Sequence, residues 1–300
     1  MSNVAVTVAS PAKLNLSLAI TGRRADGYHE LISVVALVAF GDELRAELVA
    51  PELAHDGTTL ACAAAGVPLD GTNLVLRAAA AFAAATGWRR AVAFTLVKRI
   101  PIGAGLGGGS SNAVAALRAL EQLSGHQLGA EERIELAAGL GSDCPLFWYA
   151  GPVLMRGRGE HLEALPSAAT ARVRGRRVMI FKPAFGVATA WAFKELAGRP
   201  EWYASAKETE ASLGRWCADE NATPEQLPGN TLEHPVFAKW PALPVMLAWL
   251  RERHGVTARM SGSGSACYAW LEKGTDEAAV VATIREGWGN VAFVQITTIA

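Results

Sequence analysis

Apolar and polar residues alternate along the first twenty positions, which is the period of a β-strand with one buried face. Val4, Val6 and Val8 alternate with smaller or polar residues, and a second alternation follows Pro11, with apolar residues at 14, 16, 18 and 20. Lys13 and Asn15 fall on the opposite face and therefore project from the same side of one predicted strand. The alternative is an ordinary solvated polar face. A third apolar run, residues 31–40, predicts the next strand.

The rest of the chain alternates between strand and helix patterns. A β-type run covers residues 92–96, and residues 155–160 resemble a hairpin between two domains. Helices are predicted after Thr72 or Asn73 as N-cap, over 113–123, 127–140, 244–254 and 278–288, and in the segments 185–193 and 195–228. Strands are predicted at 178–181, at the end of 259–271, and over 291–299. This second half suits a split βαβ, ferredoxin-like layer. The segment 195–228 is polar and tryptophan-containing, and it carries no interpretable motif.

A glycine-rich stretch, P-I-G-A-G-L-G-G-G-S-S-N over residues 101–112, lies between the predicted strand 92–96 and the predicted helix 113–123. Free N–H groups and the positive end of a helix dipole make such a junction an anion site, most often for phosphate. The alternative is a flexible linker. No lysine follows the glycines, which excludes a Walker-type loop. The dinucleotide pattern fails because Glu121 and Glu131 lie in or beside helical segments and do not close a second strand.

Composition narrows the class of protein. The 300 residues are 51% hydrophobic and 19% charged, which indicates compact, folded structure, and the formal net charge of zero gives no global field for nucleic acid or an anionic membrane. The four scattered cysteines indicate reduced thiols: Cys62, Cys144, Cys217 and Cys267. No signal peptide and no membrane-spanning stretch is recognised, so a cytoplasmic protein is expected.

Two further segments hold candidate chemistry. A polar turn over residues 21–29 ends in Tyr28 and His29, and such a pair beside a turn is, in isolation, usually part of an ordinary surface. Asp143 follows a glycine turn and precedes a proline-led helix start. Such an acidic residue is often only an N-cap, and the sequence pattern alone leaves that alternative open.

Three motifs, P-A-K-L-N-L at 11–16, the glycine loop, and S-G-S-G-S at 261–265, resemble in order and spacing those of the GHMP kinases. The resemblance implies an α+β, two-domain GHMP kinase fold. Residues 1–157 would form the N-terminal α/β domain with the glycine-rich ATP loop, and residues 158–300 the C-terminal ferredoxin-like α/β sandwich. The segment 11–31 and the G-S-D-C-P-L-F turn resemble the branch of this family whose substrate is a cytidine diphosphate sugar alcohol of the non-mevalonate isoprenoid route.

The resemblance also implies residue roles. Asp143 would accept the proton of the attacking hydroxyl, Lys13 would orient that hydroxyl and hold Asp143 ionised, and Asn15 would contact the substrate. ATP phosphates would lie against Pro101, Ile102, Gly103, Ala104, Gly105, Leu106, Gly107, Gly108, Gly109, Ser110 and Ser111, with adenine near Asn73, Lys98 and Ile102. A cytidine pocket would comprise Tyr28, His29 and Phe193, and the substrate wall Thr189, Gly262 and Gly264. Mg²⁺ would arrive with ATP, with no acidic protein ligand identified and Ser110 as a candidate contact.

The expected protein is thus an ATP- and Mg²⁺-dependent kinase of a small molecule, without nucleic-acid or membrane partners, and a monomer or weak dimer. Two alternatives remain. One is another GHMP kinase of the homoserine or mevalonate type, which would not depend on a cytidine moiety. The other is a catalytically silent nucleotide-binding relative.

Overall fold

The computed structural model describes residues 4–50 and 57–300. These residues form two compact units, each built from separate stretches of the chain. The first unit takes residues 4–12, 40–50, 57–102 and 107–150, and the second takes 13–39, 103–106 and 151–300. The two long strands β1 (Ala5–Arg23) and β2 (His29–Leu48) therefore contribute residues to both units.

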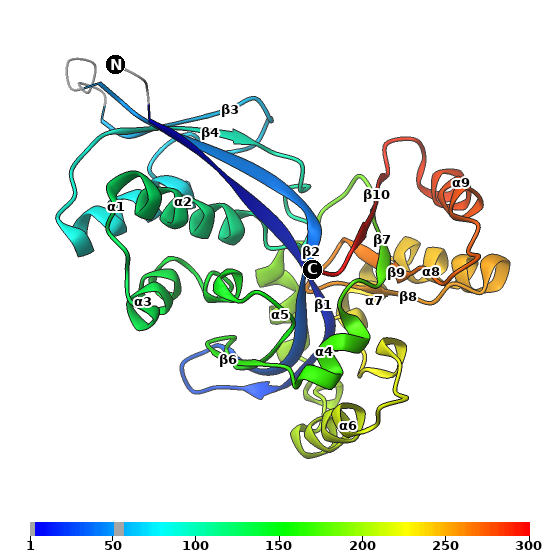
Figure 1. Cartoon of the computed structure of the whole chain (residues 1–300). Helices are drawn as coiled ribbons and strands as arrows, with labels where there is room; N and C mark the ends of the chain where they lie inside the picture. The colour runs from blue at the N-terminus through cyan, green and yellow to red at the C-terminus, as the bar shows by residue number, and fades with distance from the viewer. Residues whose placement is uncertain (1–3, 51–56) are drawn as a thin grey trace. The chain divides into compact units, whose positions relative to one another are not determined.

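The first unit combines strand pairs with helices. β4 (Val92–Val97) pairs antiparallel with residues 43–48 of β2 and parallel with β3 (Thr59–Cys62). The α-helices α1 (Leu74–Thr86) and α2 (Gly108–Ser124) pack side by side, followed by α3 (Ala130–Leu140) and the 3-10 turn η2 (Pro145–Trp148) (Figure 1). Their core includes Leu44, Phe82, Phe94 and Leu117, none more than 1% exposed.

The second unit contains an antiparallel four-stranded sheet in the order β10-β7-β9-β8. Its strands are β7 (Arg177–Lys182), β8 (Ala258–Met260), β9 (Cys267–Trp270) and β10 (Phe293–Thr298). When these four strands are numbered from one to four in sequence order, their order across the sheet is four, one, three, two, as in ferredoxin-like layers. The predicted ferredoxin-like arrangement is therefore confirmed.

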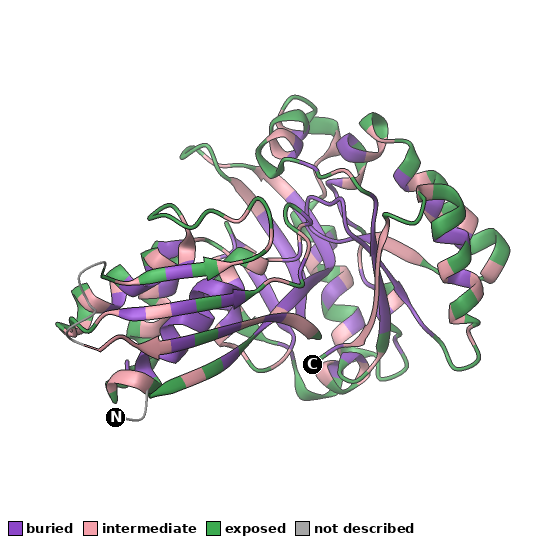
Figure 2. Ribbon diagram, turned by 90° about the horizontal axis from the view of Figure 1, so that it is seen from above, coloured by how far each residue is buried: buried purple, intermediate pink, exposed green. Residues whose placement is uncertain are grey.

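Helices and a hairpin complete the second unit. The hairpin of β5 (Val153–Gly157) and β6 (His161–Ala164) pairs with residues 31–35 of β2. The helices are α4 (Ser167–Val173), α5 (Thr189–Ala197), α6 (Ala206–Ala218), α7 (Glu233–Lys239), α8 (Ala242–His254) and α9 (Glu277–Trp288), with 3-10 turns η3 (Pro200–Trp202) and η4 (Pro224–Gln226). Figure 2 shows buried residues concentrated along strands, whereas several helices keep one exposed face.

Most predicted elements are confirmed, with shifted ends. The hairpin predicted at 155–160 is the turn between β5 and β6, and Asn73 is the N-cap of α1. The alternations before and after Pro11 form one strand of 19 residues, not two. α2 begins at Gly108, not at Ala113, since the first turn of a helix makes few internal bonds and tolerates glycine. α3 begins at Ala130, not at Gln127, because Gly129 is its extended N-cap. β3, α4 and α7 were not predicted.

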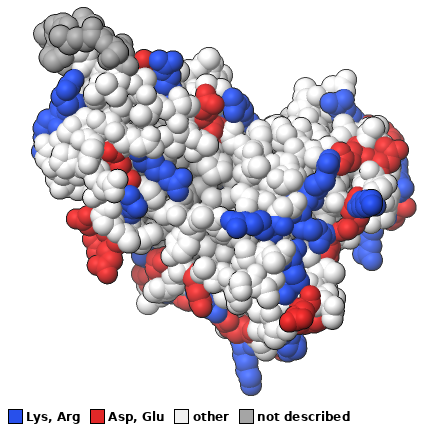
Figure 3. All heavy atoms as spheres, in the orientation of Figure 1, with Lys and Arg blue, Asp and Glu red and all other residues white. Residues whose placement is uncertain are grey.

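The distribution of surface charges and the state of the cysteines match what the composition predicts. On the face shown in Figure 3, basic and acidic side chains are interspersed. All four cysteines carry free thiols. Among residues 4–50 and 57–300, no helix has the length and apolar character needed to cross a lipid bilayer.

Gly41 of β2 is a position where a side chain has no room. A Cβ there would overlap the carbonyl oxygen of Ser10 and lie 2.6 Å from the Cα of Pro11, both backbone atoms of β1. We expect Gly41→Ala to lower the free energy of unfolding by about 1–3 kcal/mol, because the strands would have to move apart. Urea unfolding measures the change.

Gly214 provides the matched control. It is exposed in the interior of α6, and a Cβ there would meet no atom within 4 Å. Gly214→Ala should raise stability by about 0.5–1 kcal/mol through helix propensity. Equal effects of the two substitutions would contradict the close approach at Gly41.

Candidate active site

The three sequence motifs meet through backbone hydrogen bonds in the second unit. The N–H of Lys13, from the first motif, donates to the carbonyl of Leu106 in the glycine loop at 3.0 Å. The N–H of Ala266, just after the third motif, donates to the carbonyl of Ala104 at 3.2 Å. The 103–106 part of the loop is thus bonded to both other motifs.

Lys13 and Asn15 are both 6% exposed, so the alternative of a solvated polar face is wrong. The Lys13 ammonium donates to Asn15 Oδ1 at 2.5 Å, and Asn15 Nδ2 donates to Ser33 Oγ at 2.9 Å. The backbone N–H of Asn15 donates to Ser261 Oγ at 3.1 Å. A lysine that is almost excluded from water and fixed by such contacts is held in a defined position.

The 261–265 turn approaches these residues with its backbone. Gly262 has φ 58°, and a Cβ there would lie 3.1 Å from Asn15 Oδ1 and 3.4 Å from Lys13 Nζ. Gly105 has φ 75°, and a Cβ there would lie 2.8 Å from the Ser261 carbonyl oxygen. Glycine is required at both positions because they combine left-handed backbone with close contact.

Side chains from other elements also hold the turn. Asn230 Nδ2 donates to the carbonyls of Met260 and Gly262 at 3.0 and 2.7 Å. Thr189, at the start of α5, hydrogen-bonds Ser263 Oγ at 2.8 Å, which supports its predicted place beside the turn.

Lys182, at the end of β7, is 6% exposed and has no carboxylate partner within residues 4–50 and 57–300. Lys182 Nζ donates to the carbonyls of Pro183 and Phe185, at 2.9 and 2.8 Å, and burial lowers the pKa of this lysine. Ser265 Oγ donates to the same Phe185 carbonyl at 2.6 Å. The end of β7 is thereby tied to the turn.

His29 lies in an aromatic cluster of the second unit. Its ring centroid is 5.0 Å from that of Phe193 and 6.1 Å from that of Tyr203. Burial, and then the charge of Arg23, lowers the pKa of His29, so the imidazole is neutral at pH 7. The structure brings His29 and Phe193 together as predicted. Tyr28 instead is 53% exposed, with the guanidinium of Arg158 5.0 Å from its ring centroid.

In the first unit, the predicted anion site is the N-terminus of α2. Its N-cap is Gly107, in the left-handed conformation, and no side chain caps the helix. The first backbone N–H groups of α2 are therefore available to a ligand. The side chains of Ser111 and Asn112 form hydrogen bonds within the unit. Ser10 Oγ donates to Ser111 Oγ at 2.8 Å, and Asn112 Nδ2 donates to Ser10 Oγ at 2.7 Å.

The base of this loop is held by Asp42, whose side chain is fully buried. Asp42 Oδ1 accepts from the N–H groups of Arg99 and Ile100 at 2.7 and 2.8 Å, and Oδ2 accepts from Asn112 Nδ2 at 2.9 Å. The ammonium of Lys98 forms an ion pair with the same carboxylate. Sequence reasoning missed Asp42, since a single acidic residue inside a strand gives no pattern.

The other residues predicted near adenine differ in their surroundings. Asn73 caps α1, with Oδ1 accepting from Val75 N at 2.9 Å and Nδ2 donating to the Pro68 carbonyl at 2.7 Å. Ile102 is 50% exposed and offers an apolar surface.

Asp143 and Ser110 both contribute to the surroundings of Cys144. Both interact with the thiol of Cys144, whose pKa is raised to about 11, mainly by burial and also by the charge of Asp143, while a hydrogen bond with Ser110 opposes the shift. Cys144, not Asp143, occupies the N-cap position of η2, so the N-cap alternative for Asp143 is wrong. The first unit therefore places a carboxylate and a hydroxyl around one cysteine.

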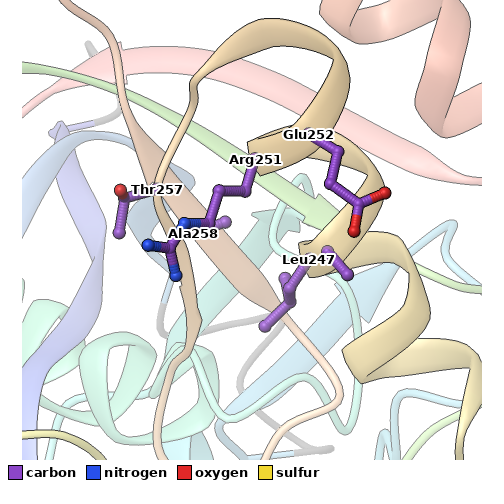
Figure 4. Close-up of a pocket in the computed structure, with 6 residues that line it drawn as sticks. Leu247, Arg251, Glu252, Thr257 and Ala258 are labelled. Atoms are coloured by element: carbon purple, nitrogen blue, oxygen red, sulfur yellow. The ribbon is translucent and has the colours of Figure 1, made fainter.

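The cavity of about 590 Å³ shown in Figure 4 lies elsewhere in the second unit. It is lined by Leu247, Ala248, Arg251 and Glu252 of α8 and by Thr257 and Ala258. None of the predicted site residues lines it. Within the described ranges, no group of three or more His, Cys, Asp or Glu residues could hold a metal ion.

Comparison with known proteins identifies the family. The family model of the GHMP kinases N terminal domain matches residues 73–151, and that of the GHMP kinases C terminal matches residues 206–290. A 4-diphosphocytidyl-2-C-methyl-D-erythritol kinase of Parvibaculum lavamentivorans is 37% identical, over 94% of this chain and 96% of that protein. One of Methylorubrum extorquens is 39% identical over the same shares.

This chain belongs to the 4-diphosphocytidyl-2-C-methyl-D-erythritol kinase family. A crystal structure of a 4-(cytidine 5'-diphospho)-2C-methyl-D-erythritol kinase, at 33% identity, matches with a TM-score of 0.76 over 98% of this chain and 100% of that one. Homoserine kinase from Cytophaga hutchinsonii, at 19% identity, matches with a TM-score of 0.72 over 98% of this chain and 95% of that one, which shows the shared fold. Members of this family are GHMP kinases, so the predicted fold class and kinase activity are confirmed.

The Asp42–Lys98 pair gives a test of the first unit of this kinase. We expect Asp42→Asn to lower the free energy of unfolding by about 3–5 kcal/mol, because it leaves the Lys98 ammonium buried without its counter-charge. Chemical denaturation measures the loss. Adding Lys98→Met to Asp42→Asn should recover part of the stability, whereas simple addition of the two losses would contradict an interacting pair.

Proposed function

We propose that this protein transfers the γ-phosphoryl group of ATP to the 2-hydroxyl of 4-diphosphocytidyl-2-C-methyl-D-erythritol, giving the 2-phosphate and ADP, in the non-mevalonate isoprenoid route. Full-length similarity to kinases named for this substrate supports the proposal. The observation that carries the proposal is the half-buried His29 ring against Phe193, whose Nε2 atom is buried and has no hydrogen-bond partner among the described residues. A buried ring nitrogen without a partner is suited to hydrogen-bond the polar edge of a nucleobase.

In this proposal Asp143 accepts the proton of the attacking hydroxyl, and Lys13 orients that hydroxyl and counters charge on the phosphoryl group. The two residues belong to different units, so their joint action is part of the proposal. Phosphoryl transfer depends mainly on positioning and charge neutralisation, so Asp143 need not be a strong base. The buried contacts of Lys13 with Asn15 support a positioning role.

ATP phosphates would bind the 101–111 loop and the uncapped start of α2. Mg²⁺ fits a site of this kind because it commonly keeps several waters and binds through substrate phosphates with few protein ligands. Ser110, in the first turn of α2, would be its protein contact. When bound, the ion would neutralise charge on the β- and γ-phosphates.

The cytidine base would bind at His29 and Phe193, with Tyr28 at its exposed side, and the sugar alcohol would lie along Asn15, Thr189 and the 261–265 turn. We expect the protein to act in the cytoplasm, as a monomer or weak dimer. Kinases of the homoserine or mevalonate type remain the second candidate, but their likeness at 12–19% identity supports the fold alone.

The direct test measures ADP release with ATP, Mg²⁺ and 4-diphosphocytidyl-2-C-methyl-D-erythritol. The matched control is the same sugar alcohol without the cytidine diphosphate. We expect turnover only with the cytidylated compound. Turnover of homoserine or mevalonate instead would favour the second candidate, and no turnover at all, with ATP still bound, would favour a silent nucleotide-binding protein.

Asp143→Asn tests the proposed base. It keeps the size of the side chain but removes the carboxylate, so we expect kcat to fall by about 10²–10⁴-fold. ATP binding, measured by calorimetry, should persist because the loop is intact. Wild-type turnover in this variant would remove Asp143 from the catalytic role.

A further inference from the structure

The segment 195–228, which carries no sequence motif, contributes one ring to the His29 cluster. That ring is Tyr203, which directly follows the 3-10 turn η3. Its backbone N–H donates to the Pro200 carbonyl at 3.1 Å, and the next N–H, of Ala204, donates to the Ile20 carbonyl of β1 at 2.9 Å. The backbone on both sides of Tyr203 is therefore fixed to the second unit.

The neighbouring side chain also holds the turn in place. Trp202 stacks on His234 of α7, with ring centroids 5.7 Å apart and an interplanar angle of 20°. The guanidinium of Arg199 lies 4.8 Å from the centroid of Trp202 on the same turn. η3 is thus packed against another element, and the position of the Tyr203 ring is defined.

The polar end of Tyr203 has no partner in the free protein. Among the described residues, five buried side-chain nitrogen or oxygen atoms lack a hydrogen bond, and two of them are Tyr203 Oη and His29 Nε2. These two belong to rings that contact one another, with centroids 6.1 Å apart. Buried polar atoms are nearly always paired, so two unpaired atoms on adjoining rings call for a common explanation.

Tyr203 is half-buried, with a buried hydroxyl oxygen, whereas Tyr268 is a buried tyrosine whose hydroxyl has a structural partner. Tyr268 of β9 is 1% exposed, and its hydroxyl donates to the Leu16 carbonyl of β1 at 3.0 Å. If Tyr203 served only to pack against His29, phenylalanine would supply the same ring without an unpaired hydroxyl. The hydroxyl of Tyr203 is therefore suited to a hydrogen bond with a ligand.

We propose that Tyr203 is a specificity-determining residue whose hydroxyl hydrogen-bonds the polar edge of the substrate's pyrimidine base, beside His29 Nε2. The proposal rests on the proposed function. It assigns part of the recognition of the base to Tyr203, the residue that follows η3. A hydroxyl can donate and accept, and an imidazole supplies one donor and one acceptor, so together they can match adjacent donor and acceptor atoms on a base edge.

The decisive variant is Tyr203→Phe, which keeps the ring beside His29 and removes only the hydroxyl. We expect KM for the cytidylated substrate to rise about three- to tenfold, with kcat and the KM for ATP unchanged. The dissociation constant of cytidine 5'-diphosphate, measured by calorimetry, should rise by the same factor. The melting temperature of the free protein should stay equal or increase, because the lost hydroxyl had no partner.

Tyr268→Phe is the matched control. It removes a hydroxyl that is already bonded to Leu16, so the melting temperature should fall while KM for the cytidylated substrate stays unchanged. A Tyr203→Phe variant that behaved like Tyr268→Phe would overturn the proposal, as would one with wild-type KM and wild-type affinity for cytidine 5'-diphosphate. If the wild-type protein neither turned over the cytidylated substrate nor bound cytidine 5'-diphosphate, the proposed function itself would fail.

Discussion

The close packing of backbone on backbone at Gly105 and Gly262 is the contact on which the second unit's part of the site depends. At Gly105 a Cβ would lie 2.8 Å from the Ser261 carbonyl oxygen, and at Gly262 a Cβ would lie 3.1 Å from Asn15 Oδ1 and 3.4 Å from Lys13 Nζ. The ammonium of Lys13 donates to the Asn15 side chain, and the glycine at 262 leaves room for both groups beside the turn. Any enlargement at these glycines would displace a buried cation along with the loop.

In the first unit, a buried carboxylate holds the glycine-rich loop in place. One buried carboxylate, Asp42, binds two consecutive backbone N–H groups after β4, the ammonium of Lys98 and the amide of Asn112 in α2. The strand before the glycines and the helix after them are thereby joined at one point. The flexible-linker alternative is inconsistent with such anchoring, because the loop is short and both of its ends are fixed.

The sequence predicted the features that depend on local pattern. Alternation predicted the strands and the shared face of Lys13 and Asn15, and the glycines predicted the loop between β4 and α2. It placed the start of α2 too late, because glycine propensity describes helix interiors and not an uncapped first turn. Asp42 and Tyr203 could not be predicted, since each acts through residues distant in sequence that the fold alone brings near: Asp42 through Lys98 and Asn112, and Tyr203 through His29. Predicted roles near adenine remain predictions.

The division of β1 and β2 between the two units has a consequence for how such a protein can be altered or can evolve. The second unit needs residues 13–39 from the start of the chain, and the first needs residues up to 150. No single cut of the gene separates them into two complete pieces. The two units must therefore be inherited together, and substrate range can change by substitution of single residues but not by exchange of one contiguous segment that carries a whole unit.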